Sequence, residues 1–349
     1  MDSITHIVLG AAIGEALAGK KLGKKAMLLG AIAQSLPDID FLASFWMDPA
    51  RDVWVHRGIT HSLLFVALLT PLLAWAAARI YRRSRRSGSD LQSPATPVMT
   101  FGNWCVFFGL QLFVHIFIDA FNAYGTGWFE PFDHYRVSFH ILFVADPFYS
   151  CWLGISFLAL LILKRDSRRR KFWVRFGLIA SSLYLYYCIM NKYRVDTLVK
   201  KELQQQRITY KRYFTTPTPL NSWLWFIVTE DSAGYHTGYI SVFDRKQSKD
   251  FRFFPRNDSL LAPFRSHPDV QYLLRFSQGY YTVEQWKDRL VFNVLRFGEM
   301  KGWEDPQAHF VFHYFLQFPG DNEVIVQRGR FAGWDAKTFR AFIRRIKGN

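Results

Sequence analysis

Residues 55–62 read VHRGITHS and lead directly into the apolar run Leu63–Ala78. Two histidines, His56 and His61, therefore stand at the start of a segment whose composition suits lipid. Ionisable side chains are costly in such segments and by default mark a functional site. The stretch predicts a polar site at the point where a membrane helix begins.

Three further apolar runs have a similar composition, namely Val106–Ala123, Ile141–Leu163 and Phe172–Met190. They approach or reach the about 20 residues that a helix needs to cross about 30 Å of hydrocarbon. After residue 191, charged and polar residues are spread evenly. We therefore predict a mainly α, polytopic membrane domain over residues 1–191, followed by a small soluble α+β domain over residues 192–349.

The first 40 residues predict a helical hairpin. We expect Ser3 to cap a helix that runs to about Ala18, and a second helix from about Ala26 to Ser35 that Pro37 ends. The lysine-rich residues 19–25 lie at the tip between them. An antiparallel hairpin returns the sequence Pro37-Asp-Ile-Asp to the level of His6, at the end opposite the lysines.

The segments after the last apolar run alternate as strands do. We expect residues 46–61 to be a polar connection, residues 200–206 to form a linker helix, and residues 335–346 to form an amphipathic closing helix. The predicted strands are Trp223–Thr229, Tyr239–Phe243, Leu290–Phe297, Phe310–Phe318 and Glu323–Gln327.

Much of the net charge of +16 is concentrated in two short runs, residues 79–86 and 164–171, each directly after an apolar run. This is the positive-inside pattern, so we expect both runs to be cytoplasmic. Anionic lipid headgroups are then better partners than nucleic acid. Counting crossings places the histidine and aspartate segments, and the C-terminal domain, on the non-cytoplasmic side.

Histidines and aspartates gather at the ends of several apolar segments. Imidazole nitrogen and carboxylate oxygen bind zinc and related divalent ions. His115 and Asp119 are four residues apart and share one helix face. Each residue alone has an ordinary explanation as a cap or a core hydrogen bond, but together they predict one shared metal site that could hold two ions. The candidate ligands are His6, Asp38, Asp40, His56, His61, His115 and Asp119.

The candidate catalytic residues are Asp40, Arg57 and Asp146. Metal ions can activate water and stabilise a transferring oxyanion. An aspartate that is not a ligand could act as general base or orient a ligand histidine. Arg57 could clamp an anionic substrate such as a phosphate, and a lipid headgroup contact explains it equally well.

Several of these motifs resemble the YdjM-type family of inner-membrane, metal-dependent hydrolases over about residues 1–190. They are Asp2-Ser-Ile-Thr-His6 with Gly10, Pro37-Asp-Ile-Asp40, His56-Arg-Gly-Ile-Thr-His-Ser62, His115-Ile-Phe-Ile-Asp119 and Asp146-Pro147. The resemblance implies a fold distantly related to the helical zinc phospholipases C. It also implies hydrolysis of a phosphoester or lipid-like substrate at a multinuclear zinc site. The seven candidate ligands would then be ligands or near-ligands.

A non-enzymatic membrane protein is the alternative, either an ion-binding transporter or an anchor that displays the C-terminal domain. A transporter needs polar groups that continue through the bilayer, whereas here they gather at one end. Glu15, part-way along the first predicted helix, is the main exception. An anchor would keep its function without the histidines.

Overall fold

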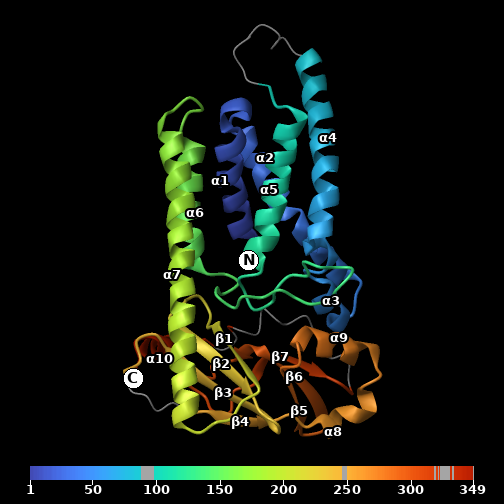
Figure 1. Cartoon of the computed structure of the whole chain (residues 1–349), viewed down its shortest axis with the longest axis vertical. Coiled ribbons are helices and arrows are strands. Elements are labelled where there is room, and N and C mark those ends of the chain that lie inside the picture. Colours follow the sequence, from blue (N-terminus) through green and yellow to red (C-terminus); the bar gives the residue numbers. More distant parts are fainter. Residues whose placement is uncertain are drawn as a thin grey trace. The chain divides into compact units, whose positions relative to one another are not determined.

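The computed structural model describes residues 1–87, 98–245, 250–317, 320, 322, 331 and 334–348. The chain divides into two compact units. The first comprises Met1–Phe41, Arg57–Phe139 and Val144–Tyr186, and the second comprises Leu42–His56, His140–Phe143 and Tyr187–Asn349. The membrane-type helices form the first unit and the two β-sheets lie in the second (Figure 1).

The predicted N-terminal hairpin is present as α1 (Ser3–Leu22) and α2 (Lys25–Ser35). Asp2 caps α1 by accepting a 3.0 Å hydrogen bond from Thr5 N, so the predicted cap at Ser3 was one residue too late. Glycines let the two helices meet backbone to backbone, because a Cβ on Gly30 would lie 2.1 Å from the Gly10 carbonyl oxygen. This contact sets how closely the ends of α1 and α2 approach.

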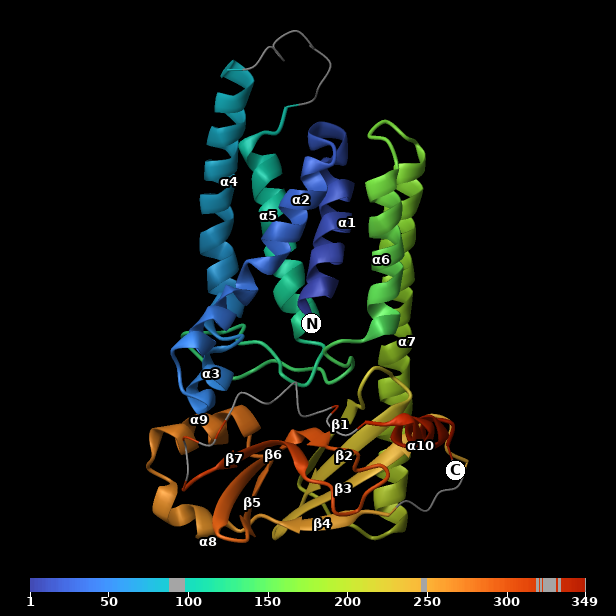
Figure 2. The same ribbon diagram turned by 180° about the vertical axis from the view of Figure 1, so that it is seen from behind.

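Four further helices follow the hairpin, and Figures 1 and 2 show α6 beside α7 from both sides. Three helices among the described residues, α4, α5 and α7, are long and apolar enough to cross a membrane, and the bent pair of α2 and η1 is a fourth, broken candidate. Three of the predicted apolar runs are therefore confirmed as span-length helices, whereas the run Ile141–Leu163 forms the shorter apolar helix α6 of 16 residues. The helices are α4 (Leu63–Ser87), α5 (Phe101–Asp119), α6 (Pro147–Ile162) and α7 (Arg169–Gln205).

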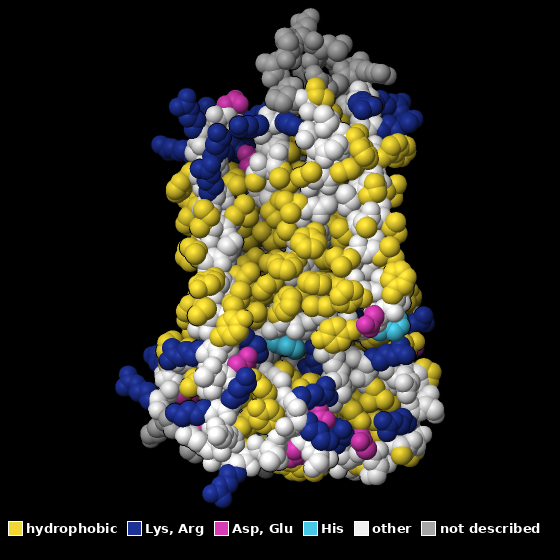
Figure 3. Space-filling model, viewed as in Figure 1, with side chains coloured by type: hydrophobic (Ala, Val, Ile, Leu, Met, Phe, Trp, Pro, Cys, Tyr) yellow, Lys and Arg dark blue, Asp and Glu magenta, His cyan; other side chains and the backbone are white. Residues whose placement is uncertain are grey.

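Helix α7 runs without a break over 37 residues. The last predicted crossing, Phe172–Met190, and the predicted linker helix are therefore one continuous element. Hydrophobic side chains cover the middle of the helices in Figure 3, and lysines and arginines gather beyond them at one end. Arg170 makes a 2.7 Å ion pair with Glu15 near that end, which accounts for the acidic residue within α1.

Short elements precede α4 in the chain, and a long loop follows α5. Residues 46–61 were predicted as a polar connection, but they contain α3 (Pro49–Val55) and η2 (Ile59–His61) after η1 (Pro37–Phe45). Ser62 accepts a 3.0 Å hydrogen bond from Phe65 N and so starts α4. The loop between α5 and α6 is closed by a bridge between Thr126 and Val137.

The second unit contains two antiparallel sheets, in the orders β1-β2-β3-β4 and β5-β6-β7. The predicted α+β character is confirmed, whereas β1, β4 and β5 were not predicted and the expected strand Glu323–Gln327 lies outside the described residues. The strands are β1 (Arg212–Pro217), β2 (Leu224–Glu230), β3 (Gly234–Ser241), β4 (Arg252–Pro255), β5 (Tyr281–Trp286), β6 (Arg289–Glu299) and β7 (Phe310–Phe315). The remaining helices are α8 (Asp258–Leu261), η4 (Ala262–Phe264), α9 (Pro268–Ser277) and α10 (Ala336–Ile346).

Apolar packing explains how helices join these sheets. Val195, Val199 and Leu203 of α7 pack against Trp225 and Ile227 of β2. Further along the chain, Phe342 and Ile346 of α10 pack against Leu224. Both sets of residues are fully or almost fully buried, so the C-terminal part of α7 belongs to the core of the second unit.

Candidate metal centre

Four side chains from three elements converge in the first unit. They are Asp38 of η1, His61 of η2, and His115 and Asp119 of α5. Each offers one ligand atom, and these atoms all lie within 4.8 Å of one another. His61, His115 and Asp119 are completely buried, and the Asp38 side chain keeps 18% of its surface exposed.

The separations among these atoms fit a single small ion. His61 Nε2 lies 3.4 Å from Asp38 Oδ1 and 3.5 Å from Asp119 Oδ2. His115 Nε2 lies 3.5 Å and 3.7 Å from the same two oxygens, and 3.1 Å from His61 Nε2. Four ligands arranged tetrahedrally at about 2.0–2.1 Å from zinc lie roughly 3.3–3.4 Å apart. The observed spacing therefore matches a tetrahedral zinc set.

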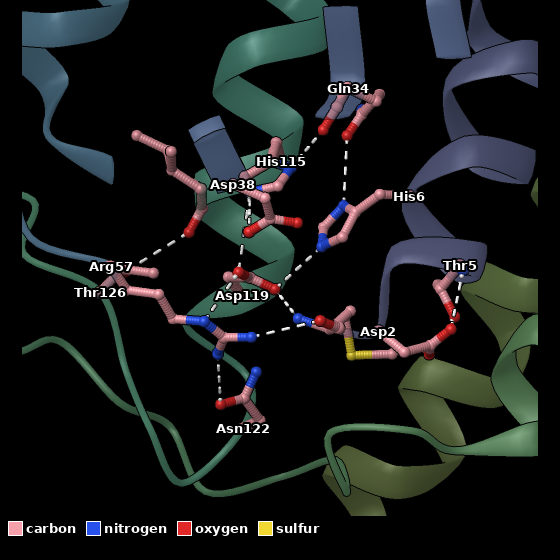
Figure 4. Close-up of polar contacts among 12 residues, drawn as sticks. Asp2, Thr5, His6, Gln34, Asp38, Arg57, His115, Asp119, Asn122 and Thr126 are labelled. Carbon is pink, nitrogen blue, oxygen red and sulfur yellow. Dashed lines mark hydrogen bonds and ion pairs between the residues drawn. The ribbon is translucent and has the colours of Figure 1, made fainter. Parts of the chain in front are cut away.

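The tautomer of His115 is fixed by α2. Its Nδ1 lies 2.5 Å from the backbone carbonyl oxygen of Gln34. A carbonyl oxygen can only accept, so Nδ1 carries the hydrogen and Nε2 presents a lone pair. Figure 4 shows the contact with Gln34 on one side of the His115 ring and Asp38 and Asp119 on the other side.

The tautomer of His61 is fixed by its own loop. Asp40 Oδ2 accepts the hydroxyl hydrogen of Thr60 at 2.8 Å, so Thr60 Oγ1 is left to accept from His61 Nδ1 at 3.0 Å. Asp40 Oδ2 also lies 3.4 Å from that nitrogen. The Nε2 lone pair of His61 therefore points at His115. Asp40 lies next to the other ring nitrogen of His61 and orients the ring, as carboxylates commonly do for histidines that bind metal ions.

The Nε2 lone pairs of His61 and His115 face each other across 3.1 Å. They repel each other unless a metal ion or a proton lies between them. The carboxylates of Asp38 and Asp119 border the same position with negative charge. Asp119 Oδ2 is buried and accepts no hydrogen bond from any described residue. The donor set therefore fits a divalent cation better than a network of hydrogen bonds.

His6 joins this group from α1. Its ring stacks on His115 with centroids 3.9 Å apart, and its Nε2 lies 3.1 Å from Asp119 Oδ1. Its Nδ1 lies 3.4 Å from the side-chain oxygen of Gln34. Gln34 thus contacts two of the histidines, one through its backbone and one through its side chain, and it depends on the hairpin contact described above.

Arg57 is buried beside the centre in the left-handed conformation, with φ of 61°. Its Nε lies 3.3 Å from Asp119 Oδ2, and its two terminal nitrogens donate to Asn122 Oδ1 at 3.0 Å and to the Met1 carbonyl at 3.2 Å. Burial lowers the pKa of this guanidinium. Since all three nitrogens face protein groups, Arg57 holds Asp119 in position.

The other predicted site residues lie apart from the four-residue group. Asp40 accepts from Arg57 N at 2.7 Å and faces the far nitrogen of His61. His56 ends α3 and belongs to the second compact unit. Asp146 caps α6 by accepting from Phe148 N and Tyr149 N at 2.9 and 3.3 Å, and it accepts the Tyr184 hydroxyl at 3.0 Å.

Some residues near the centre carried no recognisable sequence signal. Gln34 and Asn122 act through hydrogen bonds whose partners are distant in the chain. Arg136 is also buried, and burial lowers its pKa to about 10, with a further contribution from Arg57. A buried arginine in a predicted loop could only have been found from the fold.

We expect Asp146→Asn to retain bound metal and any activity within about 2-fold, because asparagine is an equally good helix cap. Asp146→Ala is expected to cost about 1 kcal/mol of stability. Burial raises the pKa of Asp146 to about 6, above its value in an unfolded chain. Its contribution to stability is therefore complete below about pH 4 and lost as pH rises through about 6. Thermal unfolding against pH should show this loss in the native protein and not in Asp146→Asn, and inactivity of a folded Asp146→Asn would instead assign the residue to catalysis.

The fold and the buried histidine–aspartate group define a class: a polytopic membrane protein with a candidate metal centre. The family model described as YdjM inner membrane protein matches residues 1–195. The chain therefore belongs to the YdjM inner membrane protein family, and the resemblance seen in the motifs is confirmed.

Two relatives support this assignment. The chain is 31% identical over 135 residues to inner membrane protein YbcI of Escherichia coli (strain K12), which covers 38% of this chain and 69% of the relative. It is 27% identical over 186 residues to uncharacterized protein YfhP of Bacillus subtilis (strain 168), covering 47% of this chain and 51% of the relative. The chain thus spans about half the length of YfhP. No solved structure matches the chain.

Proposed function

We propose that the protein is a metal-dependent hydrolase that cleaves phosphoesters at the periplasmic boundary of the inner membrane. The supporting observation is the convergence of two imidazole lone pairs and two carboxylates in a buried group. Only one member of the group has exposed surface, which a substrate could reach.

His61, His115 and Asp119 are the proposed protein ligands of a zinc ion. Two histidines with one carboxylate are a known catalytic zinc set that leaves a position for water. When bound, such an ion lowers the pKa of coordinated water and stabilises negative charge on a phosphoryl oxygen. The carbonyl of Gln34 and the Thr60–Asp40 pair keep the two Nε2 atoms directed at this position.

Asp38 is the proposed general base. Its Oδ1 lies 3.4 Å from His61 Nε2 and 3.5 Å from His115 Nε2, so it borders the enclosed position without being fully buried. In the reaction, the attacking water gives its proton to Asp38 and its oxygen bonds to phosphorus. The bond from phosphorus to the ester oxygen breaks, and that oxygen takes the proton from Asp38.

A second ion would have to bind at His6 and Asp119 Oδ1, because Asp119 turns its other oxygen towards the three remaining residues. Asp119 Oδ1 already forms a buried ion pair with the amino group of Met1. Two donors are fewer than the three protein ligands that a catalytic zinc position uses. One ion is therefore the proposed number, with His6 orienting Asp119.

The proposed side of the membrane follows from charge. Lysines and arginines gather at the end of the helices opposite the N-terminus and the metal centre (Figures 1 and 3). If that end is cytoplasmic, as the positive-inside rule predicts, the centre is periplasmic. Reporter fusions after residues 83 and 205 should then report cytoplasm and periplasm respectively, and equal signals would contradict the placement.

A non-catalytic ion-binding protein is the second candidate. The specific observation in its favour is that all four side chains lie close enough to coordinate one ion together, which would leave no position for water. The two candidates differ in the role of Asp38.

The test is to purify the protein in mild detergent, measure bound metal, and assay hydrolysis of phosphomonoesters and phosphodiesters before and after chelation and zinc restoration. We expect about one zinc per chain, loss of hydrolysis on chelation and its return with zinc.

Asp38→Asn separates the two candidates. If Asp38 is the base, the variant keeps its metal and loses hydrolysis by more than about 100-fold. Loss of metal in Asp38→Asn, together with no hydrolysis by metal-loaded native protein, would support ion binding alone. Asp133→Asn is the matched control, since Asp133 is exposed and accepts from the backbone nitrogen of Tyr135 in a loop.

A further inference from the structure

The break between α2 and η1 carries Asp38, the one member of the four-residue group with exposed surface. The two helices are bent by 53° there and together form a broken span or a re-entrant loop. Backbone that departs from a straight helix at membrane depth is tolerated where it lines a site. The exposed edge of the metal centre therefore belongs to a membrane segment.

The side chains around this edge are apolar and exposed. Ile39, which separates Asp38 from Asp40, is 51% exposed, and Phe41 is 54% exposed. Ile59, one residue before Thr60 and two before His61, is 55% exposed. Large exposed apolar surfaces on this scale mark contacts with lipid or a partner. Since they continue the broken span, lipid is the neighbour they fit.

A substrate could also approach the metal centre from the ends of the helices. Within the first unit, the loop after α5 closes this second approach. Gly127 N donates to the Arg57 carbonyl at 2.9 Å, and Leu63 N donates to the Trp128 carbonyl at 3.0 Å. Thr126 and Val137 exchange two backbone hydrogen bonds of 3.0 Å. Asn122 and Thr126, at the start of this loop, are completely buried. A water-soluble substrate arriving by that route would have to break these contacts.

The outer surface of the same loop is aromatic. Phe129, Phe132 and Tyr135 are 46%, 84% and 58% exposed. Aromatic side chains are enriched at the level of the lipid headgroups, where their rings contact both apolar and polar surroundings. The metal centre therefore lies next to a surface suited to the headgroup region.

We propose that the substrate is a membrane phospholipid that enters sideways from the bilayer through the α2–η1 break. This inference rests on the proposed hydrolase function and adds the substrate class. The acyl chains stay in the bilayer beside Ile39 and Phe41, while the phosphate reaches Asp38 and the buried histidines. The water oxygen bonds to phosphorus and its proton passes to Asp38, the phosphorus–oxygen bond to the leaving alcohol breaks, and the leaving oxygen takes that proton from Asp38.

The activity test compares each lipid with its soluble headgroup in the full chain reconstituted into phosphatidylcholine vesicles. The probes are phosphatidic acid against glycerol 3-phosphate, and phosphatidylglycerol against glycerophosphoglycerol. We expect at least one lipid to be cleaved about 10-fold or more faster than its soluble counterpart. Metal-dependent cleavage of the soluble esters alone would overturn this inference and leave the proposed function standing, whereas cleavage of none would overturn both.

Ile39→Asn should lower lipid cleavage by about 10-fold or more with bound metal unchanged. Leu158→Asn is the matched control, because Leu158 is 59% exposed on α6 and should leave the rate within about 2-fold. Equal rates in the two variants would contradict the proposed route.

A measurement independent of activity uses a spin label at Ile39→Cys, in a chain with Cys105, Cys151 and Cys188 replaced by serine. We expect collisions with oxygen, which concentrates in lipid, to exceed those with a water-soluble nickel chelate. A label at Asp133→Cys, in the exposed loop, should show the reverse. A label at position 39 that prefers the nickel chelate would place this edge in water and overturn the inference.

Discussion

Replacing His61 with alanine is expected to lower metal affinity by more than about 100-fold, so that the purified protein contains almost no zinc. Removing a partner that orients a ligand already costs about 10–100-fold in metal affinity, and His61 contributes the donor atom itself. Its Nε2 lies within 3.5 Å of atoms from all three other members of the group. Metal content after dialysis against a weak chelator measures the loss.

Two variants make this result specific. Asp40→Asn weakens the support behind His61 without removing a donor, so we expect a loss of about 10–100-fold. His134→Ala removes an exposed histidine that pairs with Glu130 at 2.9 Å, and metal content should not change. Equal metal in native protein and His61→Ala would refute the metal centre.

Gly30→Ala is expected to destabilise the first unit by at least about 3 kcal/mol and to abolish metal binding. The new Cβ would lie 2.1 Å from the Gly10 carbonyl oxygen and 2.7 Å from Gln111 Nε2. Backbone cannot move away without separating α1 from α2. That separation would also take His6 away from Gln34, and so the effect should appear in metal content as well as in the melting temperature.

Gly154→Ala provides the control for helix propensity. Gly154 lies within α6, and a Cβ there would have nothing within 4 Å. Alanine favours a helix over glycine by about 1 kcal/mol, so this variant should be as stable as the native protein or slightly more stable. A Gly30→Ala variant that melts like Gly154→Ala would show that the close backbone contact is not required.

The sequence was informative about the centre because its ligands interrupt apolar segments. Asp38, His61, His115 and Asp119 each stand at the end of such a segment, and a membrane span must place its ends at one of two levels. That restriction makes convergence predictable without knowledge of the packing. It does not separate ligands from supporting residues, and Asp40 and Asp119 look alike in the sequence.

Packing decides the remaining roles. Gln34 orients His115 through its backbone oxygen. Every residue has this atom, so the identity of residue 34 could not have predicted the contact. Arg57 itself adopts the left-handed conformation just before η2, and this turn of the chain brings its side chain to Asp119. In the second unit, β4 is short with alternating half-buried and exposed residues, so it lacks a strong strand pattern.

The ligands of the centre are spread from Asp38 to Asp119, across three segments that must first be inserted. A growing chain therefore cannot capture the ion early, and loading has to follow insertion of α5. Once bound, the ion would stabilise the assembled helices over partly unfolded forms that cannot bind it. The free energy of this stabilisation grows with the free metal concentration. If the group binds an ion as proposed, the supply of that metal would then set how long the protein survives in the membrane.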